Sequence, residues 1–402
     1  MRVLVIGAGG REQAIAWACK RHGHHVDIRA DLPEPLVADL VIVGPEAALV
    51  AGVADRCAEA HVPCFGPTAA LARLESSKGF TRTLAATLDL PSPEFHMASS
   101  AEAAVAWWRQ FGRPVVVKLD GLAAGKGVIV PDGEAATIAA IEELVAQGPI
   151  VLEERLTGPE CSLMAVCDGS VARPLPIAQD HKRIGEGDSG ANTGGMGAYA
   201  PAPLMTTELR DEVRRTVLQP AIDGLAAEGM PYVGVLYAGM MLTGSRYGAD
   251  AYSTSGMRTL EFNCRFGDPE TQVILPLLES DLIDVIEACL DGRLAEMDVR
   301  WRDGAAATVV AASEGYPGSY PKGREINGVA EAAALPGVAV FHAGTRLAED
   351  GRLLTDGGRV LAVTGVGDNL PAALARAYSG IEHIHFQGMH YRRDIGAKAD
   401  VG

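Results

Sequence analysis

Residues 114–130, PVVVKLDGLAAGKGVIV, constrain the fold of this chain more than any other segment. Two runs rich in valine and isoleucine stand on either side of a centre made of glycine, alanine and lysine. β-Branched residues favour strands and a glycine-rich centre favours a turn, so the segment predicts a hairpin. We expect a strand at 114–118, a loop at 120–127 and a second strand at 128–130.

Two lysines in this hairpin indicate a site for phosphate groups. Lys118 ends the first strand, and the loop contains Gly121, Gly125, Lys126 and Gly127. A lysine can bind a phosphate as a point charge, and a glycine-rich loop can close over a triphosphate. The loop is not a Walker A motif, because that motif leads into a helix and this loop leads into β-branched residues. The alternative is an ordinary hairpin tip, which would leave two lysines in an apolar segment without a role.

The N-terminal part of the chain alternates between apolar strands and helices. Strands are expected at 2–6, 25–30 and 39–44, with helices at 10–22 and 47–60. This alternation predicts a parallel sheet with helices on both faces, and hence an α/β protein. One connection is unusual. Only Asp31–Ala38 separates the second and third strands, whereas a parallel crossover usually takes a dozen residues or more.

The turn after the first strand, GAGGRE at 7–12, is typical of a loop that presents backbone amides to an anion at a helix N-terminus. It departs from the dinucleotide fingerprint, because Glu12 occupies the third glycine position. Two alternatives remain open at this point. The segment is a tight strand–helix turn without a ligand, or the chain is a dinucleotide-dependent oxidoreductase whose first 70 residues bind NAD.

Shifts in composition and stretches rich in turn-forming residues suggest where the chain divides into domains. We expect an N-terminal Rossmann-like domain at 1–70 and a central region at 71–300, itself divided into a small lid subdomain at 93–155 and a central domain at 156–300. Residues 180–200 contain six glycines among polar residues and are expected to form a loop. From about residue 301 to residue 402 the pattern predicts a separate α/β unit.

Two acidic segments extend the candidate site. Glu153 and Glu154 end a predicted strand, and Glu160 follows after a turn; such residues suit ribose hydroxyls, or form a solvated strand end. Glu261 and Asn263 lie two residues apart and therefore on one face of a strand. Their oxygens suit Mg²⁺ bound to nucleotide phosphates, although surface charges are the alternative.

Charge and cysteine usage exclude other classes of protein. Among 402 residues, 51 acidic against 35 basic side chains give a net charge of −16, which argues against nucleic-acid binding. There is no apolar run of about 18 residues, so no transmembrane helix is expected. Seven scattered cysteines without a CxxC pair indicate free thiols in the cytoplasm. Two histidine groups, at 22–25 and 383–390, lack the spacing of a metal site.

Taken together, the motifs resemble the phosphoribosylamine–glycine ligase family of ATP-grasp enzymes. The resemblance rests on VLVIGAGGRE, DLVIVGPEAALV, FGPT, LESSKGF, VVKLDGLAAGKGVIV, QDHKRIGEGDSGANTGGMGAYAP, EFNCRFGDPETQ and VFHAGT, in family order from residue 2 to about 396. It implies an ATP-grasp fold between a Rossmann-like N-terminal domain and a small C-terminal α/β domain. It also implies that ATP activates the carboxylate of glycine as glycyl phosphate, which the amine of phosphoribosylamine then attacks.

The resemblance assigns roles residue by residue. It implies nucleotide contacts for Lys78, Lys118, Gly121, Gly125, Gly127, Glu153, Glu154, Leu156 and Glu160, and Mg²⁺ or Mn²⁺ contacts for Glu261 and Asn263. It implies catalytic roles for Lys126, Arg265 and Asp268. The substrate residues would be Gly9, Gly10, Glu46, Asp180, Asn192, Thr193, Gly194, Gly195, Pro269 and Glu270. A monomer or small homo-oligomer is expected.

Two departures from the family pattern affect the substrate. Gln13 stands where the family has histidine in GGREHA, and the glycine-rich PGN segment after the second strand is missing. This shortening is the same brief connection found from strand spacing. A related carboxylate–amine ligase with an altered amine or phosphosugar is therefore the second hypothesis. A catalytically silent binding protein is a third, against which intact Lys118, Glu261 and Asn263 argue.

Overall fold

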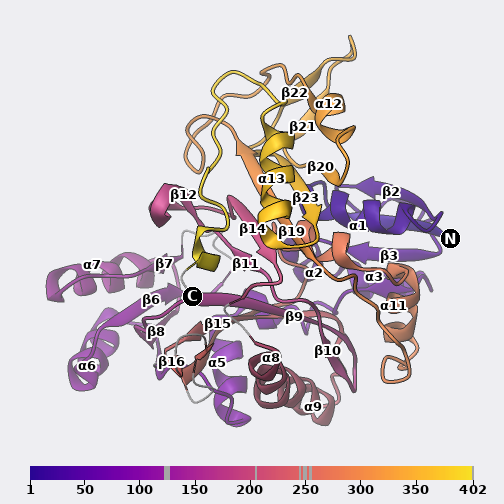
Figure 1. The fold of residues 1–402 in the computed structure, drawn as a ribbon. Helices are drawn as coiled ribbons and strands as arrows, with labels where there is room; N and C mark the ends of the chain where they lie inside the picture. Colours follow the sequence, from indigo (N-terminus) through magenta and orange to yellow (C-terminus); the bar gives the residue numbers. More distant parts are fainter. Residues whose placement is uncertain (122–126, 204–205, 244–245, 248–250, 253–255, 401–402) are drawn as a thin grey trace.

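The computed structural model describes residues 1–121, 127–203, 206–243, 246–247, 251–252 and 256–400 (Figure 1). The chain folds as an α/β protein with four sheets of four or five strands and three two-stranded ribbons within these residues. In Figure 1 the N-terminal sheet lies at the right, the hairpin unit at the left and the C-terminal strands above them. No described helix is long and apolar enough to cross a membrane.

The N-terminal sheet is parallel, as the sequence predicts. Its strands are β1 (Arg2–Ile6), β2 (His25–Arg29), β3 (Leu40–Val43) and β4 (Cys64–Phe65), in the order β2-β1-β3-β4. Its helices are α1 (Gly10–Lys20), α2 (Glu46–Val50) and α3 (Val53–Glu59). The single helix expected at 47–60 is wrong, because Gly52 adopts a φ of +78° and separates α2 from α3.

The short connection between β2 and β3 contains no helix. Residues 31–38 cross from one side of β1 to the other, with Leu32, Leu36 and Ala38 packed against the main hydrophobic core. Val37 is largely exposed. A brief coil thus replaces the helix that usually covers such a crossover.

The predicted hairpin is confirmed. Strands β6 (Val115–Leu119) and β7 (Val128–Ile129) pair antiparallel, and the four-stranded sheet has the order β5-β8-β6-β7, with β5 (Phe95–Ala98) and β8 (Ile150–Glu154). Helices α6 (Ala101–Phe111) and α7 (Glu134–Val145) pack on it. Residues 122–126 of the loop, which include Gly125 and Lys126, lie outside the described residues.

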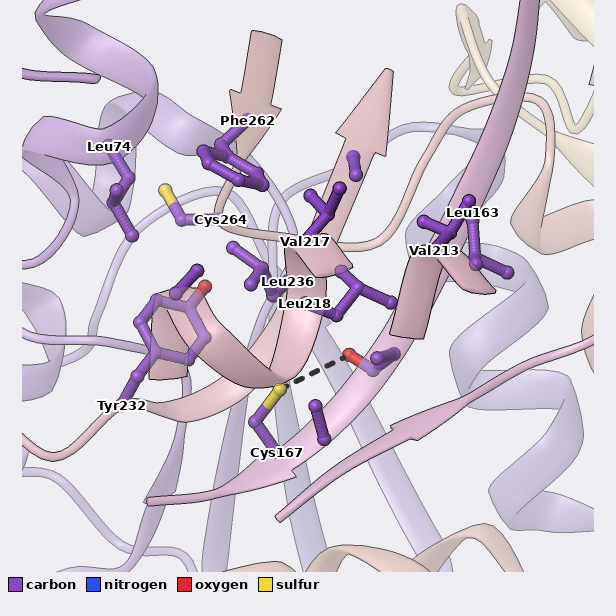
Figure 2. Close-up of a cluster of buried hydrophobic side chains, with 14 of the residues drawn as sticks. Leu74, Leu163, Cys167, Val213, Val217, Leu218, Tyr232, Leu236, Phe262 and Cys264 are labelled. Carbon is purple, nitrogen blue, oxygen red and sulfur yellow. Dashed lines mark hydrogen bonds between the residues drawn. The ribbon is translucent and has the colours of Figure 1, made fainter. Parts of the chain in front are cut away.

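The central sheet is antiparallel and buries the largest core. Its order is β10-β9-β15-β18, with strands β9 (Glu160–Asp168), β10 (Ala172–Pro174), β15 (Val233–Leu242) and β18 (Met257–Asn263). The helices α4 (Arg73–Ser76), α5 (Lys78–Thr87), α8 (Thr207–Val213) and α9 (Gln219–Ala227) contribute to the same core, with a π-helical turn at Arg214–Leu218. Figure 2 shows Leu163, Leu236 and Phe262 of the sheet facing Val213 and Val217.

The five-stranded sheet combines central and C-terminal segments. Its order is β11-β14-β19-β23-β20, with strands β11 (Gln179–Asp180), β14 (Gly197–Ala200), β19 (Ala305–Ala312), β20 (Val338–His342) and β23 (Arg359–Gly367). The division expected near residue 301 therefore does not coincide with a sheet boundary. The loop expected over 180–200 is wrong in part, because its last four residues are a fully buried strand paired with β19.

The remaining elements are short or lie at the edges of these sheets. Two ribbons flank the five-stranded sheet, β12 (Arg183–Gly185) with β13 (Ser189–Asn192) and β21 (Thr345–Leu347) with β22 (Leu353–Thr355); a third pairs β16 (Arg246–Tyr247) with β17 (Ala251–Tyr252). The other helices are α10 (Thr271–Ile274), α11 (Leu282–Leu290), α12 (Val329–Ala333) and α13 (Leu370–Ile381), with 3-10 turns at Glu186–Asp188, Leu275–Leu277 and Ala397–Asp400.

Candidate active site

A cavity between the hairpin unit and the central sheet collects most of the charged residues that the sequence singled out. Helix α5 contributes Lys78 and Arg82, strand β6 contributes Lys118, and strand β8 contributes Glu153. Strand β18 supplies the opposite wall. The full lining is Leu74, Glu75, Lys78, Thr81, Arg82, Lys118, Val128, Glu153, Leu260, Glu261, Phe262 and Asn263.

Glu153 is the buried anion of this cavity. Its carboxylate accepts two hydrogen bonds from Arg82, both at 2.8 Å, and its Oε2 lies 2.7 Å from Lys118 Nζ. Burial by itself raises the pKa of Glu153, but the adjacent charges of Lys118 and Arg82 outweigh it and lower the pKa to about 2. The carboxylate is therefore ionised and fully used in holding the two cations.

The interaction of Glu153 with Lys118 and Arg82 makes the free energy of unfolding depend on pH in the acid range. The pKa of Glu153 is lowered from 4.5 in the unfolded chain to about 2 in the folded chain, so the ionised form stabilises the fold. We expect the contribution to be complete above about pH 4.5 and to be lost, by about 3 kcal/mol, as the pH falls toward 2. Urea unfolding from about pH 6 down to about pH 3 measures it. Glu153→Gln should lack this part of the pH dependence; parallel losses in both proteins would contradict the assignment.

Three basic side chains and three carboxylates line the cavity, namely Lys78, Arg82, Lys118, Glu75, Glu153 and Glu261. Lys78, the first residue of α5 after its N-cap Ser77, donates a hydrogen bond to the Gly121 carbonyl at 3.0 Å. Burial lowers the pKa of Lys78, and the charge of Lys118 lowers it further, so the two lysines lie near each other. Arg82 and Lys118 are paired with Glu153, whereas Lys78 makes no ion pair within the described residues, so its ammonium group is available to an anionic ligand.

The wall formed by β18 has the opposite character. Glu261 is exposed to the cleft, and its Oε1 accepts a hydrogen bond from Asn263 Nδ2 at 3.3 Å. The surrounding protein raises the pKa of Glu261 by desolvation, but Lys182 and Lys118 lower it more strongly, so this carboxylate is ionised. Both side chains line the cleft beside the basic residues, and Asn263 Oδ1 accepts a hydrogen bond from Arg265 Nη2 at 3.4 Å.

Arg265 is held by two carboxylates. Its Nη2 lies 2.8 Å from Glu75 Oε1 and its Nε lies 3.3 Å from Glu46 Oε2. Burial lowers the pKa of Arg265, but Glu75 and Glu46 raise it by more, and the guanidinium stays charged. The backbone amide of Cys264 also donates to Glu75, at 2.9 Å. Arg265 is therefore fixed at the end of β18 between α2 and α4.

A second group of the predicted residues lies around Asp268, in contact with the loop that precedes β14 and with the first residue of β23. Asp268 accepts hydrogen bonds from Gln272 Nε2 at 2.7 Å and from Arg359 Nη2 at 2.8 Å. A Cβ added to Gly195 would lie 2.4 Å from Pro269 Cδ, so the two loops are in close contact there. The carboxyl of Glu270 accepts a hydrogen bond from Tyr237 at 2.9 Å, and burial together with Asp180 raises the pKa of Glu270.

The glycine turn after β1 accommodates a side chain of the protein itself. The amide of Gly9 donates to Glu12 Oε2 at 2.6 Å, and Glu12 is buried beside Arg11. A Cβ at Gly7 or at Gly44 would lie within 2.7 Å of Glu12 atoms. At Gly9, the anion that the GAGGRE turn binds is thus a carboxylate of the protein itself. Gly10 begins α1 and faces Gln272.

The remaining predicted residues lie at the margins of the site. Glu154 points away from the cavity and pairs with Arg113 at 2.7 Å, as the alternation along β8 requires. Leu156 is half-buried just beyond that strand. Glu160 is exposed and lies 3.6 Å from Lys182, while Asp180 is the largest cause of the raised pKa of Lys182. Asn192 is exposed and Thr193 half-buried, with its hydroxyl donating to the Lys182 carbonyl at 2.8 Å.

Sequence reasoning did not assign several residues that shape this site. Arg82 had a usable signal, because it lies four residues after Lys78 and hence on the same helix face. Glu75, one turn earlier, had none beyond its charge. Arg359 lies 91 residues from Asp268 and 165 residues from Gly194 in the sequence, so no local pattern connects it to the loops it contacts.

Comparison with known proteins identifies the family. Models described as the N domain, the ATP-grasp (A) domain and the C domain of phosphoribosylglycinamide synthetase match residues 29–75, 76–271 and 306–398. Phosphoribosylamine–glycine ligase of Synechocystis is 46% identical over 430 aligned positions, covering 99% of this chain and 100% of the relative. The human trifunctional purine biosynthetic protein adenosine-3 is 44% identical over 99% of this chain and 42% of its own length.

Solved structures agree with the sequence comparison. Phosphoribosylamine–glycine ligase from Thermotoga maritima superimposes with a TM-score of 0.85 at 33% identity, covering 98% of this chain and 100% of its own. N5-carboxyaminoimidazole ribonucleotide synthetase from the same organism, at 17% identity and a TM-score of 0.64, shares the fold. The chain has the ATP-grasp fold and belongs to the phosphoribosylglycinamide synthetase family of carbon–nitrogen ligases.

Proposed function

We propose that this protein ligates glycine to 5-phosphoribosylamine at the expense of ATP, giving glycinamide ribonucleotide, ADP and phosphate in purine biosynthesis. A glycine carboxylate oxygen attacks the γ-phosphorus of ATP, and the bond to the ADP oxygen breaks. The amine then attacks the carbonyl carbon of glycyl phosphate, phosphate leaves with the C–O bonding pair, and the amine loses a proton. The observation that carries the proposal is that one cavity brings together Lys78, Lys118 and the ionised Glu261.

The donor set fits a nucleotide with a divalent cation. Lys78 and Lys118 suit the triphosphate because both ammonium groups line the cavity and Lys78 makes no ion pair within the described residues. Among the described residues no group of three or more His, Cys, Asp and Glu side chains forms a complete metal cage. Glu261 and Asn263 instead offer two hard oxygens, which suits Mg²⁺, an ion that takes its other ligands from phosphates and water. When bound, Mg²⁺ or Mn²⁺ would supply neutralisation of phosphate charge.

The side chains in this scheme act by position and charge, without a covalent enzyme intermediate. Lys118, fixed by Glu153, keeps positive charge beside the phosphates while negative charge shifts to the leaving oxygens. The loop containing Gly121, Gly125, Lys126 and Gly127 would exclude water and protect the acyl phosphate from hydrolysis. Glu153, Glu154, Leu156 and Glu160 mark the side of the cleft where adenine and ribose would lie.

On the acceptor side we place the residues that surround Asp268. Arg265 remains charged between Glu46 and Glu75 and would attract the carboxylate of glycine or its phosphate. Gly9, Gly10, Asp180, Asn192, Thr193, Gly194, Gly195, Pro269 and Glu270 would form the rest of this side. We further propose a cytoplasmic enzyme that acts as a monomer or a small homo-oligomer.

One observation favours a second candidate, a ligase with an altered amine or phosphosugar. The Synechocystis relative aligns over 430 positions, more than the 402 residues of this chain, so parts of that relative have no counterpart here. The connection between β2 and β3 is brief and has no helix. An altered acceptor would follow if the missing residues contact the phosphosugar.

A steady-state assay separates the two candidates. Purified protein is given ATP, Mg²⁺ and glycine with or without phosphoribosylamine, and ADP and the amide product are measured. We expect kcat/KM for phosphoribosylamine of about 10⁴ M⁻¹s⁻¹ or more. Trapping of glycyl phosphate by hydroxylamine without turnover of phosphoribosylamine would support the altered acceptor. Absence of any glycine-dependent ADP would contradict both.

A further inference from the structure

Arg359, the first residue of β23, contacts two loops of the proposed acceptor side at once. Its Nη2 lies 2.8 Å from the Asp268 carboxylate, and its Nη1 donates to the Asp268 carbonyl at 3.1 Å. The same Nη1 donates to the Gly194 carbonyl at 2.5 Å and approaches the Gly195 carbonyl at 3.5 Å. One guanidinium thus joins segments about 75 residues apart in the sequence.

The glycine pair is shaped to receive this side chain. A Cβ at Gly194 would lie 3.0 Å from Arg359 Cζ and 3.1 Å from its Nη2, so the guanidinium lies directly against the Gly194 backbone. Gly195 has a φ of +112° and adjoins Pro269. The backbone conformation of Gly195 favours glycine, and a side chain at Gly194 would displace the guanidinium of Arg359.

A second C-terminal residue binds the backbone of Gly194 through the preceding peptide group. The amide of Gly194 donates to the Tyr316 hydroxyl at 2.9 Å. Tyr316 in turn packs against Gly358, next to Arg359, since a Cβ at Gly358 would lie 2.2 Å from its ring. The amide and the carbonyl of Gly194 are therefore both bound by residues that come from the C-terminal third of the chain.

The contact between Arg359 and Asp268 joins two opposite charges that are largely buried. The side chains of Arg359 and Asp268 are only 21% and 17% exposed, and burial and the attraction of Arg359 act on Asp268 in opposite directions, leaving its pKa lowered. A planar guanidinium can donate to a carboxylate and to carbonyls in one plane, which an ammonium cannot. None of the hydrogen bonds of Arg359 in the described structure reaches the cavity of Lys78 and Lys118.

We propose that Arg359 and Tyr316 are positioning residues that set the spacing between the 192–195 loop and the Asp268–Glu270 loop, and so determine affinity for the phosphosugar amine. The inference rests on the proposed function. Transfer of phosphate from ATP to glycine is placed beside Lys78, Lys118 and Arg265, which are not hydrogen-bonded to Arg359 in the described structure, so we expect this step to depend less on the spacing. The two half-reactions therefore respond differently when the clamp is removed.

The test compares Arg359→Gln, Arg359→Lys and Tyr316→Phe with the unmodified protein. We expect Arg359→Gln to raise KM for phosphoribosylamine by about tenfold or more, because several charge-assisted hydrogen bonds are lost. Arg359→Lys should recover part of the affinity, and Tyr316→Phe should give a smaller rise in the same KM. Glycine-dependent formation of the hydroxamate from trapped glycyl phosphate should stay within about twofold of the unmodified rate.

Arg352→Gln is the matched control, since Arg352 lies in the same part of the chain and makes only exposed ion pairs with Asp350 and Glu325. An unchanged KM for phosphoribosylamine in both Arg359 variants would overturn the inference. So would an equal loss of hydroxamate formation, which would indicate a general structural role. If the unmodified protein does not turn over phosphoribosylamine, the proposed function fails instead. Should Arg359→Gln not fold, Arg359→Lys and Tyr316→Phe still decide the question.

Discussion

Replacing Lys118 with alanine should abolish ligation while leaving the protein folded. Lys118 is buried at the end of β6 and supplies one of the cations that we place beside the triphosphate. Removing a preorganised positive group from a site of charge development typically costs 10²- to 10³-fold in rate, and we expect a fall in kcat of about that size. ADP formation with saturating glycine and ATP measures it.

The fold should tolerate this change because Glu153 keeps its two hydrogen bonds from Arg82. Thermal unfolding checks this expectation. Lys322→Ala removes a lysine that, within the described part of the chain, makes one exposed ion pair, with Asp356, and should leave activity unchanged. Near-normal ligation by the Lys118 variant would mean that the nucleotide binds elsewhere.

Replacing Glu261 with glutamine should produce a comparable loss with a different signature. The carboxylate is ionised and stands beside Asn263 at the end of β18. Glutamine keeps the shape but removes the charge that favours a divalent cation. We expect kcat to fall about 10²-fold or more and the Mg²⁺ concentration for half-maximal rate to rise.

A titration of the rate with Mg²⁺, repeated with Mn²⁺, measures both effects. Glu142→Gln, on the exposed face of α7, serves as the control and should behave like the unmodified protein. If the Glu261 variant retains full activity with an unchanged Mg²⁺ dependence, this carboxylate is not a metal ligand.

Local patterns in the sequence predicted those parts of the fold that local patterns determine. The hairpin at 114–130 followed from β-branched runs around a glycine-rich centre, and it pairs as β6 and β7. The parallel N-terminal sheet followed from the alternation of strands and helices. The strand β14 was missed because Gly197–Ala200 lacks β-branched residues, and its partner β19 begins more than 100 residues later. All four residues of β14 are buried, including the large side chain of Tyr199.

The candidate site likewise contains residues that local motifs predicted and residues that they did not. Lys118, Glu261 and Asn263 were recognisable because each lies at a strand end in a short motif, and the structure brings them to one cavity. The partners that fix these groups came from elsewhere. Arg82 bonds to Glu153 across 71 residues, and Arg359 bonds to Asp268 across 91. Such pairs leave no periodic trace, since a single charged residue on a helix or strand is usually on a solvated face.

The five-stranded sheet has a consequence for the order in which the protein can mature during synthesis. Strand β14 pairs on one side with β11, and its other side is completed only by β19, which emerges from the ribosome a hundred residues later. Until β19 has been made, the backbone N–H and C=O groups along one edge of β14 lack their strand partner. The 192–195 loop leads directly into β14, and its hydrogen bonds to Arg359 cannot form until residue 359 has been translated. The acceptor side is therefore assembled last, when translation of the chain is nearly complete.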